Sequence, residues 1–170
     1  MCIRDRNFIH NFRWSRCYNF NTNRTIYIMD KRQITDTIVI HCTQTPKDMD
    51  IDVAKVTEWH TQRGFDTIGY HYLIKRDGTL QTGRDEDAVG AHAVAVNGTS
   101  IGIALVGGGT ADMGWENNFN SEQFNTLKSI ILRLKDKYDI EKIIGHYQVE
   151  ASKECPSFDV PGWLIKNGVV

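Results

Sequence analysis

The segment Thr37-Ile38-Val39-Ile40-His41 decides the fold of this chain, because an apolar, largely β-branched run leads directly into a histidine. Such a short run is typical of a strand that is buried on both faces of a sheet. A second run of this kind, Ile143-Ile144-Gly145, leads into His146. Strand ends lie at the rim of a sheet, where functional side chains often gather. The two runs therefore predict a buried sheet with a histidine at the end of each strand.

Helical and strand-like segments alternate around these two runs. Asp52 is a suitable N-cap for a helix that Gly64 ends, and the Asp77-Gly78 pair predicts a tight hairpin turn. The other expected elements are a hairpin of Tyr70–Lys75 and Thr79–Thr82, a strand at Ser100–Val106, a helix at Ser121–Tyr138, a strand at Lys142–Ile144 and a short helix after Asp159. This order predicts an α/β fold, a single domain with a central mixed β-sheet flanked by helices.

Length and charge restrict the possible functions. The chain has 170 residues, enough for one domain with a real core, and a net charge of −1, which gives no indication of nucleic-acid binding. No apolar run approaches the roughly 20 residues that a membrane span needs. Residues 1–24 lack a steady period and a signal-peptide pattern, so we treat them as an unassigned leader, disordered or artefactual. The domain is expected at residues 25–170, since Ile26 and Ile28 alternate as in a strand.

The cysteines indicate a ligand and a core thiol rather than a disulfide framework. Cys2, Cys17, Cys42 and Cys155 show neither paired zinc-ribbon spacing nor a C-x-x-C redox motif, which fits a reducing compartment. Two other local patterns give no indication of a binding site. Gly107-Gly108-Gly109 matches no phosphate-binding motif, and residues 85–87, all acidic, are expected to form a solvated turn.

Two imidazoles and one thiolate, from His41, His146 and Cys155, are good ligands for Zn²⁺ and leave its fourth tetrahedral position for water. An open position of this kind is typical of a catalytic zinc and favours metal-assisted hydrolysis. Residue types alone do not decide whether these three residues bind a metal. Strand-end histidines are usually ordinary polar residues, and a lone cysteine is usually a small core residue. The competing histidines are His10, His60, His71 and His92.

Several separate motifs resemble those of the zinc-dependent N-acetylmuramoyl-L-alanine amidases, and in particular the short amidase-type phage lysozymes, whose fold the peptidoglycan recognition proteins share. The motifs are Ile38-Val39-Ile40-His41-Cys42-Thr43, Gly69-Tyr70-His71-Tyr72-Leu73-Ile74-Lys75-Arg76-Asp77-Gly78, Val89-Gly90-Ala91-His92-Ala93 with Asn97, Gly145-His146, and Lys153-Glu154-Cys155-Pro156-Ser157-Phe158-Asp159. They follow one another in the same order over roughly residues 25–167.

The resemblance implies a role for each matching residue. His41, His146 and Cys155 would hold Zn²⁺, Tyr70 and Lys153 would be catalytic, and His92 and Asn97 would line the substrate groove. A phenol or an ammonium near the metal can stabilise the oxyanion that forms during amide hydrolysis or move a proton. Because side chains alternate along a strand, His71 is expected to point away from Tyr70, and Cys42 away from the metal that His41 binds.

The activity implied by the resemblance is that of an endolysin, a peptidoglycan hydrolase that cleaves the amide between N-acetylmuramic acid and L-alanine of bacterial peptidoglycan. An alternative is a non-catalytic peptidoglycan-binding module, although such relatives usually lack the cysteine ligand. Another is an amidase that also inhibits a phage RNA polymerase, as some phage lysozymes do. The lack of an export signal predicts synthesis in the host cytoplasm and release to the wall through a holin.

Overall fold

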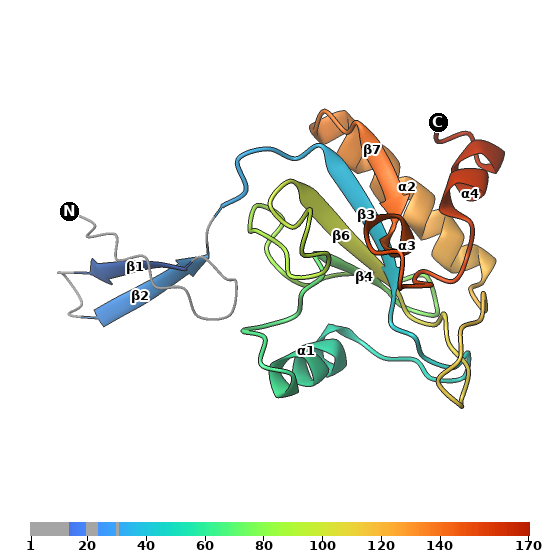
Figure 1. Ribbon diagram of the computed structural model, residues 1–170, viewed down its shortest axis with the longest axis horizontal. Coiled ribbons are helices and arrows are strands. Elements are labelled where there is room, and N and C mark those ends of the chain that lie inside the picture. Colours follow the sequence, from blue (N-terminus) through green and yellow to red (C-terminus); the bar gives the residue numbers. More distant parts are fainter. Residues whose placement is uncertain (1–13, 20–23, 30) are drawn as a thin grey trace.

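The computed structural model describes residues 14–19, 24–29 and 31–170. Its centre is a five-stranded mixed sheet with the strand order β5-β4-β6-β3-β7, which confirms the predicted α/β fold (Figure 1). The strands are β3 (Thr37–Cys42), β4 (Tyr72–Ile74), β5 (Leu80–Thr82), β6 (Ser100–Leu105) and β7 (Lys142–Gly145). Strands β4, β6, β3 and β7 are parallel, and β5 pairs antiparallel with β4 as the predicted hairpin partner.

One face of the sheet packs against helix α2 (Ser121–Lys137), and α4 (Val160–Lys166) closes the same core near the C-terminus. Asn120 caps α2 through a reciprocal capping box with Gln123, at the start of the helix expected at Ser121–Tyr138. The core combines fully buried strand and helix residues, among them Ile38, Ile40, Ile101, Ile103, Leu127, Ile131 and Leu134. This large apolar layer fixes the sheet on one side, because strand side chains alternate between the two faces.

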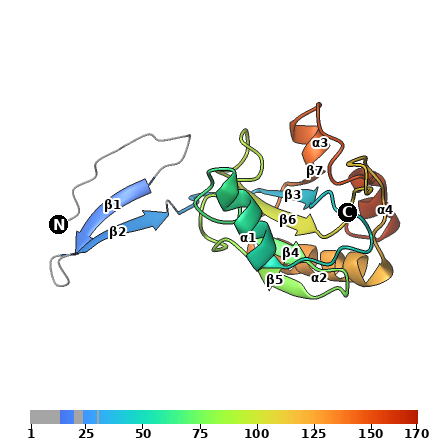
Figure 2. The same cartoon turned by 90° about the horizontal axis from the view of Figure 1, so that it is seen from below.

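The opposite face of the sheet is covered only in part. Helix α1 (Val53–Gln62), capped by Asp52, packs there over Leu73 and Ala104, on the other side of the sheet from α2 (Figure 2). This second core is smaller than the first. His41 alternates with Ile40 along β3, so its side chain lies on this face of the sheet, away from α2.

Strand register brings the two strand-end histidines together. In the parallel pair of β3 and β7, Ile40 is level with Gly145, so His41 and His146 follow at the same sheet edge. After β7, His146 begins a short helix, α3 (His146–Val149). This helix was not expected from the sequence. Two segments more than a hundred residues apart therefore meet at one edge.

The N-terminal segment forms a separate hairpin. Strand β1 (Trp14–Asn19) pairs antiparallel with β2 (Arg24–Met29), and neither pairs with the five-stranded sheet in the described part of the chain (Figure 1). The strand expected around Ile26 and Ile28 is therefore present, but it pairs with β1. Residues Cys2 and His10 lie outside the described residues.

The expectation of a solvated acidic turn at residues 85–87 is wrong for Glu86. Its carboxylate accepts hydrogen bonds from Tyr72, Arg133, Lys137 and Tyr138. Burial would raise the pKa of this carboxyl, but the hydrogen bonds, led by that of Lys137, hold it at about 2. The turn therefore helps to fasten α2 to the sheet.

Among the described residues, no helix has the length and apolar character of a membrane span.

Candidate metal and catalytic site

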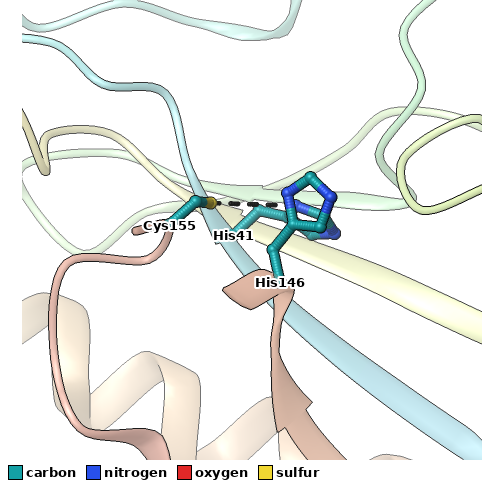
Figure 3. A group of neighbouring side chains, drawn as sticks. All are labelled: His41, His146 and Cys155. Carbon is teal, nitrogen blue, oxygen red and sulfur yellow. Dashed lines mark hydrogen bonds between the residues drawn. The ribbon is translucent and has the colours of Figure 1, made fainter. Parts of the chain in front are cut away.

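The donor atoms of His41, His146 and Cys155 lie within 4.8 Å of one another at the ends of β3 and β7 (Figure 3). His41 comes from the end of β3, His146 from the start of α3, and Cys155 from the loop that follows α3. The structure therefore brings together the three residues that the sequence analysis selected as ligands. None of the competing histidines in the described residues belongs to this set.

The His41 ring is almost fully buried, with 1% of the residue exposed, and its two nitrogens face different partners. Its Nδ1 lies 3.9 Å from Cys155 Sγ, and its Nε2 lies 3.0 Å from Nδ1 of His92. The His146 ring stacks at an angle 4.6 Å away from the His41 ring, between ring centroids. Nδ1 of His41 is consequently the nitrogen that faces Cys155, whereas Nε2 is engaged by His92.

Cys155 is held by the backbone of Cys42. The Cys42 amide N–H donates to Cys155 Sγ over 3.1 Å, a contact that favours a thiolate at this sulfur. The Cys42 thiol is not one of the three grouped donors and lies 3.8 Å from Ser157 Oγ. Cys42 thus contacts the sulfur of Cys155 through its main-chain amide, and the two thiols also interact with each other.

Burial controls the protonation of all three donors. It lowers the pKa of His41 well below the usual histidine value, and the neighbouring His146 lowers it further. It also lowers the pKa of His146, which Glu150 partly opposes. For Cys155, burial raises the pKa well above that of a free thiol. The protein alone therefore presents two neutral imidazoles, ready to bind a cation, and a sulfur that keeps its proton until a cation replaces it.

Tyr70 lies beside the three donors, just before β4. Its ring centroid is 5.1 Å from that of His41 and 5.2 Å from that of His60. Burial raises the pKa of Tyr70 far above its usual value, so the phenol keeps its proton and can donate a hydrogen bond. His71 points elsewhere, as the alternation predicted, since its Nδ1 accepts a hydrogen bond from the Gly102 amide over 2.9 Å.

Lys153 lies on the outer side of the site, next to Glu150. One Glu150 carboxylate oxygen is 3.7 Å from Lys153 Nζ and the other is 3.7 Å from His146 Nε2. Lys153 also borders an open groove of about 500 Å³, whose aromatic wall includes Trp115, Tyr147 and Phe158. The sequence analysis missed Glu150, although its position four residues after His146 on a short helix is a usable signal.

His92 contacts the side of the His41 ring that is turned away from Cys155, and Asn97 lies next to His92. His92 is 9% exposed, and its ring nitrogens contact His41 and Ser100. Asn97 Oδ1 accepts hydrogen bonds from the amides of His92 and Ala93, at 2.9 and 2.8 Å. No local sequence pattern predicts the contact between His41 and His92, because the two residues are 51 positions apart.

The chain is similar to known proteins over most of its length. The family model for N-acetylmuramoyl-L-alanine amidase matches residues 30–158. The endolysin of Klebsiella phage KP32 is 44% identical over 140 residues, which cover 82% of this chain and 92% of that protein. The endolysin of Escherichia phage T7 is 41% identical over 140 residues, with the same two coverages.

Solved structures agree with the sequence relatives. The N-acetylmuramoyl-L-alanine amidase LysC from Clostridium intestinale URNW superposes with a TM-score of 0.71 at 32% identity, covering 83% of this chain and 90% of that chain. The Drosophila peptidoglycan recognition protein LB superposes with a TM-score of 0.65 at 27% identity, covering 76% and 79%.

The fold and the grouped donors together define a hydrolase built on the scaffold that amidases share with peptidoglycan recognition proteins. More specifically, the chain belongs to the N-acetylmuramoyl-L-alanine amidase family and is a peptidoglycan hydrolase of the endolysin kind. This result favours the enzyme over the alternative of a module that only binds peptidoglycan.

Proposed function

We propose that this endolysin cleaves the amide between N-acetylmuramic acid and L-alanine with a zinc ion held by His41, His146 and Cys155. The observation that carries the proposal is the meeting of two imidazole nitrogens and one thiol sulfur within 4.8 Å at the ends of β3 and β7. Members of this family are generally zinc-dependent, which agrees with that donor set.

The donor geometry fits zinc. With usual Zn–N and Zn–S bond lengths and tetrahedral angles, a nitrogen and a sulfur ligand lie about 3.6 Å apart. The distance between His41 Nδ1 and Cys155 Sγ is 3.9 Å, so a small side-chain movement closes the difference. Three protein ligands leave one tetrahedral position for water or substrate. A zinc ion there supplies Lewis acidity toward the amide carbonyl and lowers the pKa of water.

Tyr70 and Lys153 are the proposed catalytic residues. Tyr70, which keeps its phenolic proton, can donate a hydrogen bond to the oxyanion that develops when water adds to the amide carbonyl. Lys153 borders the groove and carries a positive charge close to His146 and Cys155. It can stabilise the same negative charge or protonate the departing L-alanine nitrogen. The products are the lactyl carboxylate and a peptide with a free L-alanine amino group.

Peptidoglycan is expected to approach the site from the side of Lys153. The groove with its aromatic wall is lined by Lys153 and by Glu154, the chain neighbour of Cys155, and it is large enough to receive part of a stem peptide. Solved relatives include a peptidoglycan recognition protein LB mutant in complex with tracheal cytotoxin, at 26% identity and a TM-score of 0.68. That His92 and Asn97 contact the substrate stays a prediction.

The test compares metal content and hydrolysis in the unmodified protein and in two cysteine variants. Cys155→Ala removes a proposed ligand, whereas Cys42→Ala removes a buried thiol outside the donor set and leaves its backbone amide in place. We expect one zinc per chain and release of peptides with free L-alanine amino groups from purified sacculi, both lost in Cys155→Ala and retained in Cys42→Ala. Equal loss in the two variants, or hydrolysis that survives complete removal of metal, contradicts the proposal.

Three further proposals concern the domain boundary, a polymerase partner and the route to the cell wall. We propose that the amidase domain comprises residues 25–170, with residues 1–24 outside it, because the family match begins at residue 30, close to this boundary. A protein that starts at Thr25 should then fold, bind zinc and hydrolyse sacculi. Binding to a phage RNA polymerase, and synthesis in the host cytoplasm before holin-type release, rest on the likeness to phage endolysins. A pull-down with the cognate polymerase checks the first of these two.

A further inference from the structure

We propose that His92 is a positioning residue, which fixes the tautomer and orientation of the metal ligand His41. The inference rests on the metal site proposed above and gives His92 a different role from the expected substrate contact. Its basis is a hydrogen-bonded chain that runs from the metal side of His41 to a backbone carbonyl.

Ser100, at the end of this series of hydrogen bonds, shows which atom donates and which accepts at each step. Ser100 Oγ donates to the carbonyl oxygen of Val96 over 2.7 Å, so its single proton is used there. Ser100 Oγ must then accept from Nε2 of His92, 3.4 Å away. With the proton on Nε2, a neutral His92 has an unprotonated Nδ1 and can only accept at that atom.

His41 Nε2 lies 3.0 Å from this acceptor, so His41 must carry its own proton on Nε2. The other nitrogen of His41, Nδ1, is therefore left with a free lone pair. Nδ1 is the atom that lies 3.9 Å from Cys155 Sγ and faces the proposed metal position. A carbonyl oxygen on the Val96 turn thus determines which nitrogen of His41 is available as a ligand.

The His92 ring is held in a slot that keeps it in this orientation. A methyl group added at Gly90 would lie 2.5 Å from His92 Cδ2, and one at Gly102 would lie 2.6 Å from the same atom. Such distances are well inside van der Waals contact, so the ring lies directly against both glycines. The amide of His92 is fixed as well, since Asn97 Oδ1 accepts from it. Ring and backbone are both constrained.

His92 has no ring nitrogen left for the substrate, because Nδ1 is engaged by His41 and Nε2 by Ser100. The ring is also nearly buried, with 9% of the residue exposed. Partners that orient a metal-bound histidine typically change metal affinity by 10–100-fold when they are removed. A residue of the substrate groove would instead change binding of peptidoglycan and leave zinc affinity unaltered.

The experiment uses three variants of the full chain. His92→Asn places an amide oxygen near the position of Nδ1 and can still accept from His41, whereas His92→Gln reaches toward Ser100 and His92→Leu accepts nothing. We expect zinc affinity, measured by competition with a chromophoric chelator, to fall about 10–100-fold in His92→Leu and His92→Gln and to recover largely in His92→Asn. The Co²⁺-substituted proteins should show altered visible spectra in the same two variants.

A second readout needs no metal. In the metal-free protein, ¹⁵N spectra of the imidazoles should show His41 protonated at Nε2, and this preference should weaken in His92→Gln but persist in His92→Asn. If His92→Leu does not fold, the zinc affinities of His92→Asn and His92→Gln still test the role of His92, because both variants carry a polar side chain at this position. Unchanged zinc affinity in all three variants with a raised KM overturns the inference and supports a substrate contact. A parent protein that binds no zinc instead defeats the proposed function.

Discussion

Gly102→Ala tests the slot around His92 without changing the chemistry of any proposed ligand. Gly102 lies in the middle of β6, level with Val39 of β3. The added methyl carbon would lie 2.6 Å from Cγ and Cδ2 of the His92 ring and 2.8 Å from its Nε2. Since carbon atoms in contact are usually about 3.5–4.0 Å apart, the ring has to move by roughly 1 Å.

The displacement of the ring sets the expected loss of folding stability and the expected loss of zinc affinity. Overpacking of this kind costs about 1–3 kcal/mol in the free energy of unfolding. A shift of roughly 1 Å also takes the 3.0 Å contact between His41 and His92 out of hydrogen-bonding range. We therefore expect Gly102→Ala to be less stable than the parent by about 1–3 kcal/mol and to bind zinc about 10–100-fold more weakly.

Gly98→Ala is the matched control, because no atom lies within 4 Å of the position of its added methyl group. Its stability should stay within about 0.5 kcal/mol of the parent, and its zinc affinity should be unchanged. Urea unfolding of the metal-free proteins gives the first quantity and chelator competition gives the second. Equal zinc affinities for the two alanine variants would refute the reasoning that ties ring position to metal binding.

The remaining predictions concern catalysis, pH and the core. Tyr70→Phe should keep zinc and fold but lower kcat on sacculi by about 10²–10³-fold, because one oxyanion donor is lost; a decrease below about threefold contradicts that role. Burial lowers the pKa of His71 to about 4, so the folded protein binds fewer protons than the unfolded chain between pH 6.5 and 4. Its contribution to stability, at most about 3 kcal/mol, should be lost as the pH falls through this window, and urea unfolding of the metal-free protein should show a smaller loss in His71→Asn. Ile131→Ala, at a fully buried site, should lower the free energy of unfolding by about 2–5 kcal/mol, and Leu132→Ala, on the exposed side of the same helix, by much less; similar values for both would contradict the assigned core.

Local pattern was sufficient for most of the secondary structure. The helix that Asp52 caps, the hairpin at Asp77-Gly78 and the long helix after Asn120 all appear where the sequence placed them. Periodicity and capping act over a few residues, so they can be read without knowledge of the fold. The short helix that begins at His146 was missed, because four residues are too few for a periodic signal.

The residue types of the site could also be read from the chain, but their partners could not. The sequence by itself determined which side chains can bind zinc, since an imidazole or a thiolate has this property wherever it lies. Tertiary structure alone decided that Glu86 turns inward and that His92 is engaged by His41. These contacts depend on strand register and on which face of the sheet is left uncovered, and both are set by packing between segments far apart in the chain.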